Sequence, residues 1–172
     1  MLRTRSGLLT PEQAWKQLDA GFARGRAGTP ANMATDLKQA SRRMGETRDY
    51  MRVYWSGTAY WLAADIELRR SGTHPHGIDD VLRRFDACCL PGARAWSPAQ
   101  FVAKLDELAA RDVFAPLYRE YRARRDFPDI APLYRALGMR RAGDALRFDD
   151  GTEAADMRDA IMRMRSSAGR VE

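Results

Sequence analysis

Apolar residues recur at intervals of three and four along most of the chain, which is the spacing of one buried helix face. A strong helix start stands near the beginning, where Thr10 precedes Pro11 and Gln13 follows the threonine by three residues. Residues 97–100, with the letters SPAQ, repeat this capping pattern. Signals of this kind divide the chain into short helices separated by turns.

The predicted helices follow one another from one end of the chain to the other. They begin near residues 11, 31, 50, 78, 98, 113 and 152, and a brief helix ends before Gly138. No alternating run is long enough to build a sheet. The brief one aside, the sequence therefore predicts an all-α bundle of about six or seven helices.

Residues 139–151 break the helical pattern near the end of the chain. Leu146 and Phe148 alternate with charged residues there, and the letters DDG that follow are a turn signal. The sequence predicts a minor β-hairpin in this stretch. We therefore divide the chain into a helical subdomain, residues 1–126, and a C-terminal extension, residues 127–172, with short helices and the hairpin.

The longest predicted helix reads YMRVYWSGTAYWLAADIELRR, residues 50–70, and would span about 30 Å. Gly57 interrupts its aromatic half, where glycine costs roughly 1 kcal/mol relative to alanine. Either a neighbouring element packs too closely there for a side chain, or the position has a functional role. The predicted apolar stripe of this helix comprises Val53, Tyr54, Gly57, Trp61, Ala64 and Leu68.

The chain has 172 residues, of which 45% are apolar and 30% charged, and this is the composition of a soluble globular domain. No apolar run approaches the roughly 20 residues of a membrane span, so we expect no transmembrane helix. The first residues, MLRTRSGLLT, are basic, but no apolar h-region follows them, so we expect no secretory signal there. These features predict a soluble protein of the cytoplasm or the periplasm.

The net charge of +6 and the isoelectric point of about 9.7 raise the question of nucleic acid as a partner. The arginines are spread along the chain among acidic residues and are not gathered in one basic run. A basic helical domain that binds nucleic acid is therefore the least favoured function.

The cysteines and histidines offer no obvious metal site. Neighbouring cysteines seldom bond to each other because the geometry strains the backbone, so we expect Cys88 and Cys89 to be unbonded, small, buried apolar groups. The only histidines, His74 and His76, lie in a turn rich in glycine and proline. Two ligands are too few for a zinc site, so the sequence predicts no bound metal in this chain.

The common catalytic motifs are missing from the sequence. It has no HExxH, no Walker loop, no nucleophile elbow and no dinucleotide-binding fingerprint. The adjacent carboxylates at residues 79–80 and 149–150 suit helix caps and turns better than acid–base catalysis. Motifs alone therefore indicate a helical domain without a catalytic set.

Four segments of the chain, taken in their order, indicate more about its function than the common catalytic motifs do. They are GLLTPEQAWKQLDAGF, YWSGTAYWLAADIELRRSG, GIDDVLRRFDACC and WSPAQFVAKLDELAARDVFAPLYREY. In sequence and spacing they resemble the C-terminal helical part of the catalytic domain in the glycyl-aminopeptidase family. These are PDZ-containing zinc metallopeptidases related to the thermolysin-like aminopeptidases. The resemblance covers residues 3–121, and it implies the fold of that helical subdomain.

The resemblance also implies roles for individual residues. Tyr54-Trp55-Ser56-Gly57 stands where the family has a Y-x-K-G motif, with Ser56 in place of the lysine. In the family this tyrosine donates a hydrogen bond to the tetrahedral oxyanion beside the zinc, which a protonated phenol can do. Tyr54 is thus the expected catalytic residue, and Gly57 and Trp61 are expected to line the substrate cleft.

The family's zinc ligands, two histidines of HExxH and a downstream glutamate, have no counterpart in this chain. The resemblance therefore implies a fragment that is inactive by itself. Zinc, the peptide substrate and the N-terminal catalytic subdomain belong to the full-length parent. The extension after residue 126 is too short for the family's PDZ domain. Loss of a partner subdomain would expose apolar surface, so we also expect that the chain could form a homodimer.

The main alternative is a helical interaction module without catalysis. It predicts that Tyr54 and Trp61 are enclosed within a bundle. The metallopeptidase interpretation instead predicts an exposed groove around Tyr54, Gly57 and Trp61, where the other subdomain would dock. The burial of these side chains distinguishes the two interpretations.

Overall fold

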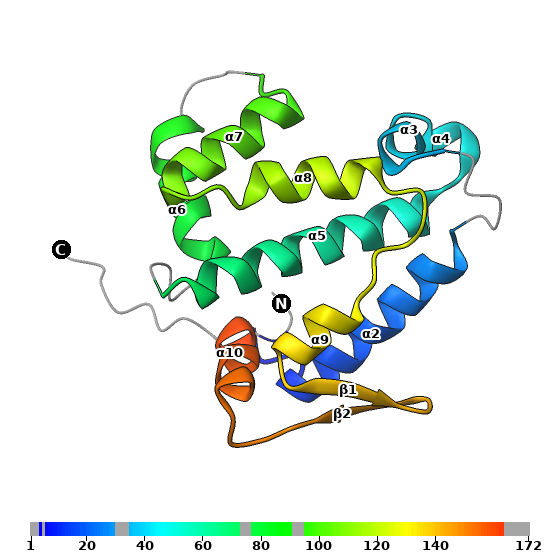
Figure 1. Ribbon diagram of the computed structural model, residues 1–172, viewed down its shortest axis with the longest axis vertical. Helices are drawn as coiled ribbons and strands as arrows, with labels where there is room; N and C mark the ends of the chain where they lie inside the picture. Colours follow the sequence, from blue (N-terminus) through cyan, green and yellow to red (C-terminus); the bar gives the residue numbers. More distant parts are fainter. Residues whose placement is uncertain (1–3, 5, 30–34, 73–76, 91–94, 164–172) are drawn as a thin grey trace.

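The computed structural model describes residues 4, 6–29, 35–72, 77–90 and 95–163. These residues form a mainly helical protein with one antiparallel hairpin (Figure 1), as the sequence predicted. The elements are α2 (Pro11–Ala27), α3 (Leu37–Arg42), α4 (Met44–Thr47), α5 (Tyr50–Arg70), α6 (Ile78–Cys89), α7 (Pro98–Ala109), α8 (Phe114–Ala123), α9 (Ala131–Ala136), β1 (Met139–Ala142), β2 (Ala145–Phe148) and α10 (Glu153–Met162).

The described residues contain nine helices, more than the six or seven predicted. One cause lies between α2 and α5, where a single helix from residue 31 to residue 43 was expected. The structure instead has two short helices, α3 and α4, and Arg48 ends the second in a left-handed conformation with φ 59°. Residues 30–34 lie outside the described part of the chain.

Two helices begin with complete capping boxes at the positions that the sequence marked. At α2, the Gln13 N–H donates to Thr10 Oγ1 at 3.2 Å, and the Thr10 N–H donates to Gln13 Oε1 at 2.9 Å. Ser97 and Gln100 exchange the same two hydrogen bonds at the start of α7. Each box satisfies two backbone donors that the helix leaves unpaired, so these two starts are set by local sequence.

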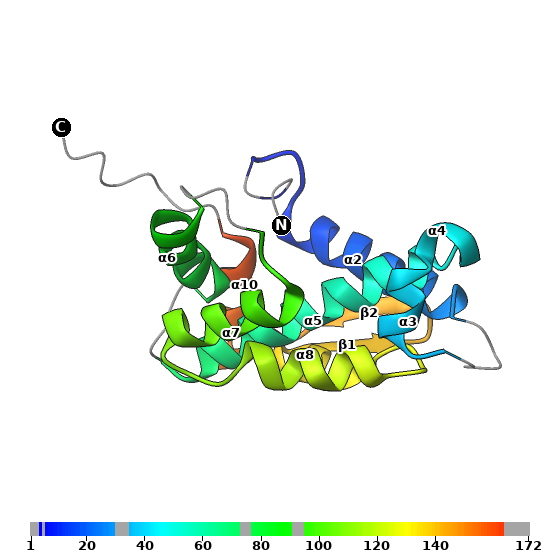
Figure 2. The same cartoon turned by 90° about the horizontal axis from the view of Figure 1, so that it is seen from above.

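Helix α5 runs through the middle of the molecule, with α2 on one side and α8 on the other (Figures 1 and 2). Its C-terminal half is covered on almost every side. The buried residues of that half are Ala59, Tyr60, Leu62, Ala63, Ala64, Asp65, Ile66 and Leu68. The C-terminal half of α5 is therefore enclosed, whereas its N-terminal half is open on one side.

Helix α2 approaches α5 closely because two glycines leave room for large rings. A Cβ atom on Gly21 would lie 2.0 Å from the Trp55 ring, and one on Gly25 would lie 2.4 Å from the Phe127 ring. Real Cβ atoms do not approach other atoms so closely, so both positions require glycine. The Trp55 and Phe127 rings also pack against Phe22, with ring centroids 6.0 and 6.4 Å away.

The C-terminal segment packs against α2 and α5 at the lower end of Figure 1. β1 pairs with β2 in a register that places Met139 opposite Phe148. The Tyr134 hydroxyl on α9 donates to Asp19 Oδ1 on α2 at 2.8 Å. Ile130 and Tyr134 belong to the same buried cluster as the residues of α5. The residues after position 126 thus share a core with the preceding helices.

In the ranges that the structure describes, every helix is too short or too polar to cross a bilayer. The turn that holds His74 and His76 lies outside these ranges.

Candidate functional site

Tyr54 lies on the open side of α5, one turn from its N-terminus. Its side chain is 59% exposed, and the neighbouring Tyr50 and Met51 are also exposed. Tyr54, which the sequence placed on the apolar stripe, is therefore not part of a buried face. The buried side of this half of α5 instead carries Arg52 and Ser56, two polar residues one helical turn apart.

Gly57 borders open space. A Cβ atom built on it would meet no packed neighbour within 4 Å. Close packing, which explains Gly21 and Gly25, does not explain this glycine. Of the two explanations that the sequence left open for Gly57, a close neighbour is excluded.

Trp61 is half-buried, one turn beyond Gly57, within a group of edge-to-face rings. Its ring centroid lies 5.1 Å from that of Tyr60, 6.0 Å from that of Phe114 and 6.4 Å from that of Phe101. Such geometry holds the indole in one orientation, because the positive edge of one ring meets the negative face of the next. Trp61 is thus a fixed wall rather than a mobile surface side chain.

Gly57 and Trp61 line a pocket of about 530 Å³ between α3, α5, α7 and α8, which we call the four-helix pocket. Figure 1 shows α3 and α7 toward opposite ends of α8. Tyr54 does not line the pocket, so the structure brings together two of the three predicted site residues. The described residues of the lining are Leu37, Lys38, Ser41, Arg42, Val53, Ser56, Gly57, Tyr60, Trp61, Ser97, Pro98, Ala99, Phe101, Val102, Tyr118, Tyr121 and Arg122.

Ser56, the residue in place of the motif lysine, lies in the wall of this pocket. Its side chain is only 1% exposed, and its Oγ has no hydrogen-bond partner among the described residues. A buried hydroxyl without a partner costs free energy. Ser56 Oγ is such a hydroxyl, without a partner among the described residues, on a residue of the pocket wall.

Arg52 lies one turn before Ser56 and is completely buried. Its Nη2 donates to the carbonyl oxygens of Thr35 and Arg125, each at 2.8 Å, and ties α5 to the segments before α3 and after α8. Its Nε and Nη1 have no partner within the described ranges. The guanidinium thus carries a buried positive charge that is bound to carbonyl groups and not to a carboxylate.

Three cations belong to the lining of the four-helix pocket, and its described lining residues include no carboxylate. Lys38 and Arg42 come from α3 and Arg122 from α8. The Arg122 guanidinium carbon lies 5.3 Å from the Tyr118 ring centroid, in a cation–π contact. None of the three cations forms an ion pair with a described residue. The pocket therefore has a positive potential.

Two tyrosines of the lining stay protonated well above neutral pH. Burial raises the pKa of Tyr121 to about 12, and the charge of Glu120 adds to the shift. Burial also raises the pKa of Tyr60, with the charge of Asp106 as the next cause. The Tyr60 hydroxyl already donates to the Phe114 carbonyl at 3.1 Å. Tyr121 has no such bond among the described residues, so its hydroxyl adds a possible donor to the pocket.

Sequence reasoning missed the buried Arg52 and two lining residues of the pocket, Ser56 and Arg122. A signal for the first two was present, because they stand four residues apart on a face of the helix that continues with Ala59 and Ala63. Two polar residues on a face that must be buried indicate either a polar network or a ligand. Arg122 had no local signal, since only the packing of α8 on α5 brings it to the pocket.

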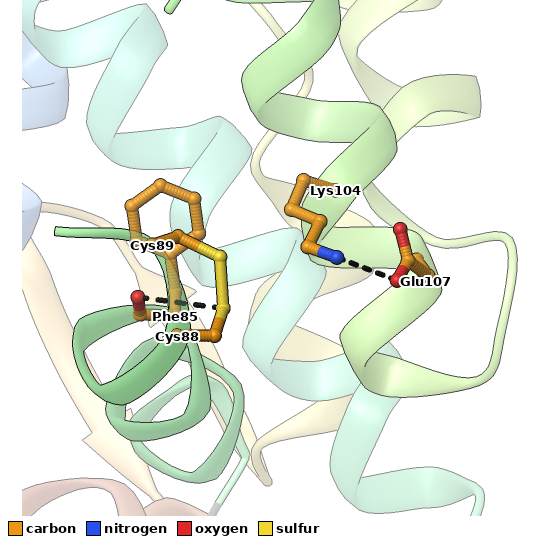
Figure 3. The surroundings of a disulfide bond; sticks show 5 residues. All are labelled: Phe85, Cys88, Cys89, Lys104 and Glu107. Atoms are coloured by element: carbon orange, nitrogen blue, oxygen red, sulfur yellow. Dashed lines mark hydrogen bonds and ion pairs between the residues drawn. A yellow bond between two sulfur atoms is a disulfide. The ribbon is translucent and has the colours of Figure 1, made fainter. Parts of the chain in front are cut away.

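The cysteines contradict the prediction. Cys88 and Cys89 form a disulfide bond at the end of α6, and Cys88 is exposed (Figure 3). Their Cα atoms are 3.7 Å apart, because adjacent residues are fixed at that spacing by the peptide bond. The helix buries Val81 and Phe85, whereas Cys88 is exposed and Cys89 is half-buried and packs against the core.

No known protein family, curated protein or solved structure matches the chain. Among the residues that the structure describes, no three His, Cys, Asp or Glu side chains converge to hold a metal ion.

Proposed function

We propose that the chain forms the helical part of the catalytic domain of a zinc-dependent aminopeptidase. Tyr54 then donates a hydrogen bond to the oxyanion that forms when the peptide bond is attacked. The proposal starts from the resemblance of residues 3–121, and one observation supports it. Tyr54, expected in a cleft, is 59% exposed one turn before the open space at Gly57.

The alternative of a non-catalytic helical module predicted that Tyr54 and Trp61 are enclosed. Trp61 is half-buried, but Tyr54 faces outward. An exposed tyrosine contributes little to a core, so its position favours a contact with another molecule.

The described residues of the chain form no zinc-binding site, because no three possible metal ligands lie together among them. We therefore assign the metal ligands and the general base to the N-terminal catalytic subdomain of the full-length parent. The exposed strip of Tyr50, Met51 and Tyr54 on α5 is the surface on which we place the contact with that subdomain. The chain alone is then inactive.

The test uses the enzyme expressed from the whole reading frame, with glycyl-naphthylamide as substrate. Tyr54→Phe removes one oxyanion donor and should lower kcat about 100- to 1,000-fold with little change in KM. Thr47→Val is the control, because it removes one hydroxyl from an exposed residue of α4 that lies outside the exposed strip on α5, and it should keep full activity. Wild-type activity in Tyr54→Phe would refute the proposed role.

A further inference from the structure

We propose that the four-helix pocket binds a small organic carboxylate with an apolar, aromatic body. This inference does not rest on the proposed aminopeptidase function. It starts from the size of the pocket, since about 530 Å³ lies within the range of small-molecule sites.

The walls of the pocket match the apolar part of such a ligand. Val53, Trp61, Phe101 and Val102 supply aliphatic and aromatic surface from α5 and α7. The ring contacts around Trp61 hold these walls in place, so the site is preformed. The open space at Gly57 leaves a flat surface on which a ring can lie.

The polar groups of the pocket match the carboxylate. Lys38, Arg42 and Arg122 provide three positive charges, and no carboxylate among the described lining residues neutralises them. The N-terminus of α7 also borders the pocket through Ser97. A helix N-terminus carries a partial positive charge and favours a bound anion.

The buried Ser56 hydroxyl is the independent sign that a ligand belongs there. It is 1% exposed, lies in the pocket wall and has no partner among the described residues. A carboxylate oxygen would accept its hydrogen bond and remove the cost of an unpaired buried group. A free amino group, in contrast, would meet three like charges. The pocket therefore suits an organic acid and not the amino end of a peptide.

Isothermal titration calorimetry of the full chain with naphthoate tests the proposal, and neutral naphthalenemethanol serves as the uncharged comparison. Naphthoate should bind one to one, and the alcohol should bind about tenfold more weakly because it lacks the charge. Equal binding of the two compounds would overturn the proposal.

Substitutions inside and outside the four-helix pocket test whether naphthoate binds there. Gly57→Leu should abolish it by filling the open space, whereas Gly45→Leu, at an open glycine of α4 away from the pocket, should not change it. The triple variant Lys38→Gln, Arg42→Gln and Arg122→Gln should weaken naphthoate about tenfold and leave the alcohol unchanged. Arg135→Gln is the matched control, because Arg135 is exposed on α9. Unchanged naphthoate binding in the triple variant would overturn the proposal even if Gly57→Leu failed to fold.

Glycyl-naphthylamide distinguishes this pocket from a peptide-binding cleft. It carries a positive amino group at neutral pH, so it should not displace naphthoate. Displacement would assign the pocket to the peptide substrate and overturn the present proposal. Loss of peptidase activity in Tyr54→Phe would leave the naphthoate result unaffected, because Tyr54 does not line the pocket.

Discussion

The glycines of the facing helices α2 and α5 differ in whether a neighbouring side chain packs against them. Gly21 and Gly25 allow the Trp55 and Phe127 rings to approach the α2 backbone, so any larger residue would clash. Gly57 has no such neighbour, and its only local effect is the weaker helix propensity of glycine. The stability of the protein should therefore respond in opposite directions to the same substitution at these sites.

Gly57→Ala should raise the free energy of unfolding by about 1 kcal/mol, because alanine is the better helix former and has room. Gly21→Ala should lower it by about 1–3 kcal/mol, because the new methyl group would overlap the Trp55 ring. Urea denaturation followed by far-ultraviolet circular dichroism measures both. A destabilised Gly57→Ala would show that a neighbour does pack against that face.

Asp65 is a buried carboxylate on α5 whose titration should affect stability. Its Oδ2 lies 3.2 Å from Arg69 Nε, and its Oδ1 accepts the Ile78 N–H at 2.8 Å. Burial raises the pKa of Asp65, and the Arg69 guanidinium opposes this shift only in part. The folded protein therefore binds the Asp65 proton more tightly than the unfolded chain does.

The direction of the pH effect follows from this linkage. The Asp65 proton stabilises the folded protein fully below the pKa that Asp65 has in the unfolded chain, about 4. This stabilisation is lost as the pH rises through the higher pKa that Asp65 has in the folded protein. Asp65→Asn cannot titrate. The stability of the wild type minus that of Asp65→Asn should therefore fall over the range of pH from about 4 upward. Urea unfolding across this range measures it, and a difference that rises with pH would contradict the linkage.

At the level of helices, two starts depend on an aspartate from the preceding helix. Asp65 on α5 accepts the first N–H of α6, and Asp106 on α7 accepts the N–H groups of Val113, Phe114 and Ala115 at 2.6–2.8 Å. The residues directly before α6 and α8 make no side-chain cap. Tertiary packing therefore fixes where these helices begin, in contrast to α2 and α7.

Asp106→Ala should lower the free energy of unfolding by about 2–4 kcal/mol, because three backbone donors at the start of α8 lose their acceptor. Asp112→Ala is the matched control, since Asp112 is exposed in the same connection, and it should change stability by less than about 0.5 kcal/mol. Equal effects of the two substitutions in urea denaturation would contradict the capping role.

The disulfide at the end of α6 should be chemically accessible without unfolding the helix. Cys88 is exposed, whereas the anchors of α6 are the buried Val81 and Phe85. Native treatment with a reducing phosphine should add about 2 Da and allow two alkylations, with little change in circular dichroism. Double alkylation of the untreated protein, measured by mass spectrometry, would show that the bond is absent.

At the level of the whole molecule, the parts that were predictable are those with local causes. Thr10 and Ser97 start α2 and α7 by bonds to residues three positions away, and the hairpin follows from its own alternation and turn. The four-helix pocket was not predictable, because it joins residues from α3 to α8 that only packing brings together.

The orientation of α5 was misjudged for a specific reason. Its N-terminal half buries Arg52 and Ser56 and exposes Tyr54, so the most apolar stripe is not the most buried one. Arg52 can be buried because carbonyl groups from two distant segments accept its hydrogen bonds. These acceptors cannot be recognised in a local pattern, and the same packing leaves Tyr54 free for an outside partner.

The reading frame upstream of the Met1 codon tests the proposed aminopeptidase origin most directly. We expect an in-frame HExxH motif followed by a downstream glutamate, which together would supply the metal ligands and general base that this chain lacks. An in-frame stop codon directly before the Met1 codon, with no HExxH chain encoded beside it, would contradict the proposal.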